Sequence, residues 1–174
     1  MIFGHRPRQG LYDPQFEHDA CGVAFVATMT GVASHEIVEQ GLEALRNLDH
    51  RGATGADPAA GDGAGILLQV PDAFLRRVTG IRLPEPGAYA VGLAFMPLDE
   101  AKRARARAAI ELIAADEGIE VLGWREVPVH THTLSKVSLG TMPHFEHLLI
   151  RDRDGRIGMD LERLAFVLRR RAQH

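Results

Sequence analysis

The stretch from Asp49 to Gly65 is the part of this sequence that most restricts the fold. It contains five glycines and one proline within seventeen residues, a density that regular helices and strands do not tolerate. A pattern of helical spacing precedes this stretch, and a short apolar run follows it. We therefore expect a loop of defined shape between a helix and a strand.

Regular elements are expected on both sides of this loop. Apolar residues three or four positions apart indicate helices, and short apolar runs rich in β-forming residues indicate strands. Because the two kinds of element alternate, the fold class is α/β or α+β with layered packing. Strands are expected at 21–28, 66–70, 88–96, 119–124 and 145–151, and helices at 34–48, 72–78, 99–117 and 160–171.

The helix expected at 99–117 carries an alanine-rich side and a basic side. Its positive charges form a run of the kind that usually faces solvent, and Gly118 is expected to end the helix. The basic run consists of Lys102, Arg103, Arg105 and Arg107, and the expected apolar face consists of Ala101, Ala104, Ala108, Leu112 and Ala115.

Length and composition indicate one soluble globular domain. The 174 residues are 45% hydrophobic and 25% charged, with a formal net charge of −3. Without a basic stripe, the chain offers no electrostatic footprint for nucleic acid. No apolar run is long enough to span a membrane, and the first twenty residues lack the apolar core of a signal peptide. Neither nucleic acid nor a membrane is therefore an expected partner.

Cys21 is the single cysteine of the chain, so it cannot form an internal disulfide. A lone thiol fits a reducing, cytoplasmic setting. A free cysteine is most often a small residue buried in the core, which is one interpretation of Cys21. The other interpretation is that Cys21 is a nucleophile or a redox thiol. Gly22 follows directly and leaves the backbone open to the close approach of a ligand.

Two long motifs resemble a known family. "LYDPQFEHDACGVAFVA" and "LRNLDHRGATGADPAAGDGAGILLQVPDAF" look like the amino-terminal glutaminase domain of the glutamate synthase large subunit. That domain is a class II glutamine amidotransferase with the N-terminal nucleophile hydrolase fold, an α+β protein built as an αββα sandwich. The resemblance is close over residues 11–74 and looser to the end of the chain. It implies that only the first part of this sandwich is present.

The resemblance implies a leader at residues 1–20 that is cleaved, leaving Cys21 at the start of a domain spanning 21–174. A free α-amino group has a pKa of about 7.7 to 8.0, so it can accept the proton of a thiol whose pKa is about 8.5. An internal amide nitrogen cannot do this. The implied reaction is attack of the Cys21 sulfur on the side-chain amide of glutamine, release of ammonia, and hydrolysis of the thioester to glutamate.

The resemblance also places Arg51 near the nucleophile, where its guanidinium could bind a substrate carboxylate. An equally good interpretation is that Arg51 and Asp57 only tie the glycine-rich loop to the core. The loop has neither the lysine nor the spacing of a phosphate-binding loop.

The other parts of such an enzyme are expected outside this segment. In the family, the ammonia reaches a second site where 2-oxoglutarate is aminated. No cofactor is expected within these residues; FMN and an iron-sulfur cluster belong to the rest of the complete enzyme. The expected partners are glutamine, the remainder of the large subunit, and a reductase small subunit.

One family feature is missing. The oxyanion hole of the family includes an Asn-Gly pair, but Asn47 is the single asparagine of this chain and Leu48 follows it. The sequence therefore also allows an alternative, an inactive fragment that acts only as a folding or interaction module.

Four histidines, His130, His132, His144 and His147, are candidate ligands of a metal site. The first two lie at i and i+2, which in a strand puts both imidazoles on one face. Ordinary polar histidines are favoured, because no cysteine or carboxylate cluster completes a recognisable ligand spacing. We therefore expect no metal. The single tryptophan, Trp124, is expected in the core.

Overall fold

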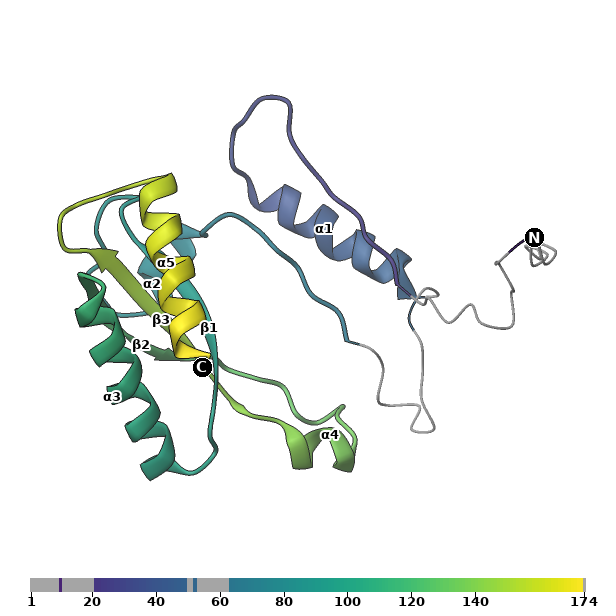
Figure 1. The fold of residues 1–174 in the computed structure, drawn as a ribbon. Helices are drawn as coiled ribbons and strands as arrows, with labels where there is room; N and C mark the ends of the chain where they lie inside the picture. The colour runs from purple at the N-terminus through teal and green to yellow at the C-terminus, as the bar shows by residue number, and fades with distance from the viewer. Residues whose placement is uncertain (1–9, 11–20, 50–51, 53–62, 174) are drawn as a thin grey trace. The chain divides into compact units, whose positions relative to one another are not determined.

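The computed structural model describes residues 10, 21–49, 52 and 63–173. It divides the chain into two compact units, Met1–Leu67 and Leu68–His174, which are described separately below (Figure 1). This division was not predicted, since the composition indicated one globular domain. The expected boundary between a leader and a domain lies at residue 21. The residues just before it are not described by the structure, so this boundary stays a prediction.

Helix α1 (His35–Asn47) is the regular element described in the first unit. Ser34 occupies the N-cap position in an extended conformation. Glu36 lies in the first turn and Arg46 in the last turn, where each charge interacts favourably with the helix dipole. The predicted helix at 34–48 is therefore confirmed. A Cβ atom added at Gly41 would lie 3.0 Å from the Cδ1 of Ile66, so glycine permits Ile66 to approach the helix closely. No residue of α1 is buried.

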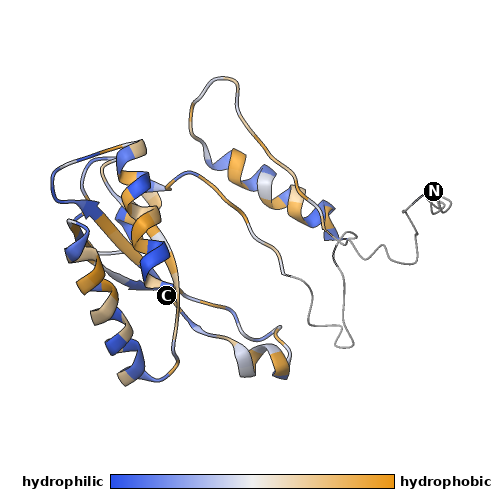
Figure 2. Cartoon of the chain, in the orientation of Figure 1, coloured by the Kyte–Doolittle hydropathy of each residue, from blue (hydrophilic) through white to orange (hydrophobic). Residues whose placement is uncertain are grey.

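The strands predicted at 21–28 and 66–70 are not formed, which is a correction. Both segments lack regular structure, although their apolar character is plain in Figure 2. Val23 is 89% exposed, Phe25 93% and Leu67 100%. A β-strand takes its backbone hydrogen bonds from a neighbouring strand, and neither segment has such a partner in the described part of the chain. Suitable residues alone do not make a strand.

The second unit contains the other helices and the sheet. Each helix and strand predicted from 72 onward is confirmed within about two residues at its ends, as expected for boundary assignments. Helix α4 was not predicted. The elements are α2 (Asp72–Val78), β1 (Ala90–Met96), α3 (Glu100–Asp116), β2 (Ile119–Glu126), α4 (Lys136–Thr141), β3 (His144–Asp152) and α5 (Met159–Ala172).

The sheet is antiparallel and three-stranded, in the order β1-β3-β2. Leu149 of the central strand lies opposite Val91 on one side and Gly123 on the other. The register shifts between Val121 and Gly123, which marks a β-bulge. The unit is therefore a mixed α/β structure with an antiparallel sheet.

The two faces of the sheet bury different core clusters. Side chains alternate between the faces of a strand, so neighbours along β3 serve opposite layers. Helices α3 and α5 cover one face, and α2 with the segment after it covers part of the other (Figure 1). The first cluster contains Ala114, Ile119, Leu148, Ile150 and Leu168, and the second contains Leu75, Leu83, Tyr89 and Leu149.

Helix α3 begins and ends as expected but presents a different face to the core. Asp99 accepts a hydrogen bond from the Lys102 backbone N–H at 2.8 Å, and Gly118 ends the helix with φ +73°. The predicted apolar face is wrong: all five of its residues are exposed, and Leu112 is 73% exposed. Ile110, Ile113 and Ala114 face the core instead. Two arginines of the helix form ion pairs with a buried carboxylate of the sheet.

Candidate functional site

Cys21 is exposed at the start of the irregular segment 21–28. The segment ends in a turn in which Thr28 Oγ1 accepts a hydrogen bond from the Thr30 backbone N–H at 3.2 Å. Gly31 follows with φ +68°, a conformation that favours glycine. The interpretation of Cys21 as a buried core residue is therefore wrong. Its sulfur lies at the surface, where a substrate could reach it.

The predicted substrate residue Arg51 lies outside the described residues, and so does Asp57. The structure therefore does not test their placement beside Cys21. The entry to the glycine-rich loop is described: Leu48 N–H donates to the carbonyls of Ala44 and Leu45, and Gly52 N–H donates to Asp49 O, each at 3.1 Å. The chain thus leaves α1 through tight turns.

A buried carboxylate cluster lies between α3 and the sheet. Glu146 is 0% exposed and accepts two hydrogen bonds from Arg107, one from Nε at 2.7 Å and one from Nη2. Arg103 Nε lies 3.7 Å from Glu146 Oε1, and His144 Nε2 lies 3.1 Å from the same oxygen. Arg103 and Arg107 belong to the run predicted to face solvent, so for these two residues that prediction is wrong.

The electrostatics of Glu146 follow from this geometry. Hydrogen bonds from Arg107 lower the pKa of Glu146 below its ordinary value, although burial opposes this shift. The same hydrogen bonds raise the pKa of Arg107. The pair is therefore charged over the whole neutral range. Sequence reasoning missed it, although Glu146 shares its strand face with Leu148 and Ile150, a pattern that indicates burial.

The four histidines considered as metal ligands lie in separate neighbourhoods. The rings of His130 and His132 are in edge contact, with centroids 5.9 Å apart, in the loop before α4. His144 faces Glu146, whereas His147 Nδ1 lies 3.3 Å from Arg125 Nη1 on the opposite face of β3. Burial lowers the pKa of His147, and the Arg125 charge adds to this shift. Among the described residues, no group of three or more potential ligands could hold a metal ion.

Trp124 packs against the first core cluster, which confirms its predicted place. Its Nε1–H donates to Glu111 Oε1 at 2.8 Å, and the Arg107 guanidinium lies 5.7 Å from the ring centroid. Trp124 therefore serves packing. In the described part of the chain, no helix is long and apolar enough to cross a membrane.

Helix α2 is tied to the segment that follows it by a charged network. Arg76 Nε donates to Asp72 Oδ2 at 2.9 Å, and its terminal nitrogens donate to the carbonyls of Leu83, at 3.0 Å, and Pro84. Tyr89 OH donates to Asp72 Oδ1 at 2.9 Å. These contacts fix the course of the chain from α2 into β1.

We expect Tyr89 to ionise at unusually high pH. Burial first, and then the hydrogen bond to Asp72, raise the pKa of Tyr89 to about 12 from an ordinary value of 10.0. Because the folded pKa is the higher one, the stabilisation is complete below pH 10.0 and is lost as the pH rises through about 12. Tyrosinate absorbance in a Tyr12→Phe variant, which retains Tyr89 as its one tyrosine, measures this pKa.

The Asp72→Asn variant is the control for this titration. This substitution should lower the pKa of Tyr89 only part of the way from about 12 toward 10.0, because the burial of Tyr89 still raises it. Trp124 fluorescence reports whether the protein is still folded at each pH. Ionisation of the folded protein at the ordinary pH of 10.0 would contradict the prediction.

Comparison with known proteins gives consistent results. The family described as "Glutamine amidotransferases class-II" matches residues 21–174. The glutamate synthase (NADPH) large chain of Bacillus subtilis is 41% identical over 177 residues, which cover 100% of this chain and 12% of that protein.

Two further relatives are similar. Ferredoxin-dependent glutamate synthase 2 of Synechocystis is 38% identical over 156 residues, covering 88% of this chain and 10% of that protein. Glutamate synthase (NADH) of Saccharomyces cerevisiae is 44% identical over 144 residues, covering 78% of this chain and 7% of that protein. The chain thus spans from 7% to 12% of the length of these three relatives.

Proposed function

Since the chain belongs to the class II glutamine amidotransferases, we propose that it forms part of the glutaminase domain of a glutamate synthase, with Cys21 as the nucleophile. The resemblance stated from the sequence motifs is confirmed by the family match and by the relatives. One observation carries the proposed role of Cys21: the family match begins at residue 21 itself. This start supports removal of the residues before it.

Removal of the leader would give Cys21 both chemical groups that it needs. The sulfur is the nucleophile, and the new α-amino group, with a pKa of about 7.7 to 8.0, accepts the thiol proton. The exposed position of Cys21 supports this role, because a glutamine side chain can approach the sulfur without moving a packed core.

The proposed reaction proceeds in two steps. The sulfur adds to the carboxamide carbon, and the tetrahedral intermediate collapses by breaking the carbon–nitrogen bond. The leaving nitrogen takes the proton held by the α-amino group and departs as ammonia. Water then attacks the thioester, which releases glutamate and returns the proton to the thiol. We propose that Arg51 binds a carboxylate of the substrate.

We propose that the complete domain has the αββα sandwich of N-terminal nucleophile hydrolases. The antiparallel sheet with α3 and α5 on one face supports this. Segments 21–28 and 66–70 carry β-forming residues that are largely exposed. In the sandwich these segments would become strands, because neighbouring strands would supply their hydrogen bonds and cover their apolar side chains.

The remaining steps are proposed for other parts of the complete protein. There the ammonia would aminate 2-oxoglutarate, with FMN, an iron-sulfur cluster and a reductase small subunit supplying electrons. The residues of this chain do not fit such a cluster, because it is held by several cysteine thiolates and Cys21 is the single cysteine. The reducing, cytoplasmic setting expected from that cysteine stays a prediction.

Labelling by a glutamine analogue tests the proposed nucleophile. The analogue carries a diazoketone in place of the side-chain amide. Its diazo carbon takes up a proton, and the thiolate then displaces dinitrogen from that carbon, which forms a stable thioether. The chain beginning at Cys21 should be labelled once, at Cys21, because its α-amino group activates the thiol. A chain that begins one residue earlier, at Ala20, is the matched control, since its Cys21 nitrogen is an amide. It should be labelled on the order of a hundredfold more slowly.

The intact mass of each product reports both processing and labelling. Expression of the 174-residue chain should yield a species that lacks residues 1–20. Equal labelling of the Cys21 and Ala20 forms would contradict the role of the α-amino group. Labelling of neither form, while a general thiol reagent modifies both, would contradict glutamine recognition.

A further inference from the structure

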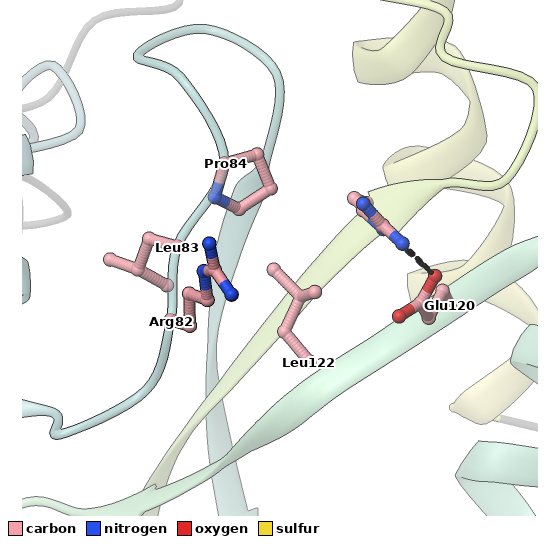
Figure 3. Close-up of a pocket in the computed structure, with 6 residues that line it drawn as sticks. Arg82, Leu83, Pro84, Glu120 and Leu122 are labelled. Atoms are coloured by element: carbon pink, nitrogen blue, oxygen red, sulfur yellow. Dashed lines mark hydrogen bonds and ion pairs between the residues drawn. The ribbon is translucent and has the colours of Figure 1, made fainter.

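A cavity of about 380 Å³ opens at one end of the sheet in the second unit. Figure 3 shows that side chains from the segment after α2 form one wall and that side chains from β2 and β3 form the other. A cavity of this size fits a small organic molecule. It is lined by Arg82, Leu83, Pro84, Glu120, Leu122 and Arg151.

The charged groups of the cavity are unevenly paired. Arg151 and Glu120 are cross-strand neighbours, and Arg151 Nε and Nη2 lie 2.8 and 2.6 Å from Glu120 Oε2. Arg82 has no hydrogen bond or ion pair with any residue that the structure describes. The Arg151–Glu120 pair is neutral as a whole, so the lining carries one uncompensated positive charge, that of Arg82.

The apolar wall of the cavity is held in place. Arg76 donates hydrogen bonds to the carbonyls of Leu83 and Pro84, which anchors this segment to α2. Leu83 is 7% exposed, and Leu122 packs against the same core cluster. The wall is therefore preformed, so a ligand would lose little free energy in ordering it.

We propose that this cavity binds a small organic carboxylate with a short aliphatic body. One uncompensated guanidinium matches one carboxylate, which it can bind through two parallel N–H donors. Leu122 and Pro84 offer carbon surface to the aliphatic part. The described lining offers no second uncompensated cation for a phosphate dianion. The proposal goes beyond the glutaminase function, and it rests on residues of the second unit alone.

Methyl NMR of the 174-residue chain with labelled leucines tests the proposal. Sodium propionate, which carries one carboxylate and a short aliphatic body, is the probe, and we expect saturable shifts of the Leu83 and Leu122 methyls. Arg82 is exposed, so the Arg82→Gln variant should bind about fivefold more weakly, because a charge-assisted, two-point contact that water partly screens is lost. Arg82→Lys keeps the charge but not the paired donors, and it should bind with intermediate affinity. Arg77→Gln, on the exposed side of α2, removes the same charge and should bind like the parent.

The outcomes separate the alternatives. Shifts that do not saturate, or that appear equally with inorganic phosphate, would overturn the carboxylate site. Equal weakening by Arg82→Gln and Arg77→Gln would show a general charge effect and overturn it too. Unchanged Leu149 methyl signals verify that each variant is folded. Failure of this test leaves the Cys21 labelling unaffected, so the two proposals fail independently.

Discussion

The Glu146→Gln variant is expected to unfold with a free energy about 3 kcal/mol lower than that of the parent chain. Removing one member of a buried ion pair typically costs about 3–5 kcal/mol, because the other charge is left without compensation. The lower end applies here, since the side chain of Arg107 is 38% exposed and can be partly hydrated. Arg103 and His144, at 3.7 and 3.1 Å from Glu146 Oε1, also lose the neighbouring negative charge. Urea denaturation followed by Trp124 fluorescence measures the difference.

The pH dependence of this difference has a definite sign. The folded pKa of Glu146 lies below its ordinary value of 4.5, so the stabilisation is complete above pH 4.5. It is lost as the pH falls through the folded pKa. The parent and the Glu146→Gln variant should therefore approach equal stability in acid.

Asp160→Asn is the control for Glu146→Gln. Asp160 forms an ion pair with Arg163 at 3.0 Å, but the two side chains are 62% and 74% exposed. Exposed pairs contribute less than about 1 kcal/mol, because water and ions screen them. An equal decrease in the free energy of unfolding of the two variants would contradict the conclusion that burial makes the Glu146 ion pair more important for stability than the exposed pair.

The second large effect concerns catalysis by the chain alone. The chain beginning at Cys21 should hydrolyse glutamine on the order of a hundredfold or more slowly than an intact amidotransferase. Loss of one oxyanion-hole donor typically lowers the catalytic rate about a hundredfold or more, and this sequence has no Asn-Gly pair to supply that donor. Release of glutamate from glutamine measures the rate, and Cys21→Ala should abolish what remains.

Two outcomes would change this interpretation. Turnover at the rate of an intact enzyme, abolished by Cys21→Ala, would mean that this chain supplies other oxyanion donors. No turnover, combined with no labelling by the diazoketone analogue, would favour the inactive interaction module.

Local features of the sequence identified much of the second unit and the family. Helix α2 was predicted with its observed bounds because a helix depends on residues within one or two turns of each other. Asp99 and Gly118 marked the ends of α3 because capping is also local. The motifs around Cys21 and the glycine-rich loop identified the class II glutamine amidotransferase, since the chemistry of a nucleophile is tied to its immediate neighbours.

Tertiary structure decided which surfaces are covered. One side of α3 was expected in the core, but Glu146 on β3 pairs with Arg103 and Arg107 of that helix, and all five residues of the predicted apolar face are exposed. Segment 21–28 has the residues of a strand but no neighbouring strand among those described. The cavity at Arg82 joins residues about forty and seventy positions apart in the sequence. Periodicity and caps are read within a few residues, whereas strand pairing and the burial of charge depend on partners that only the folded chain brings together.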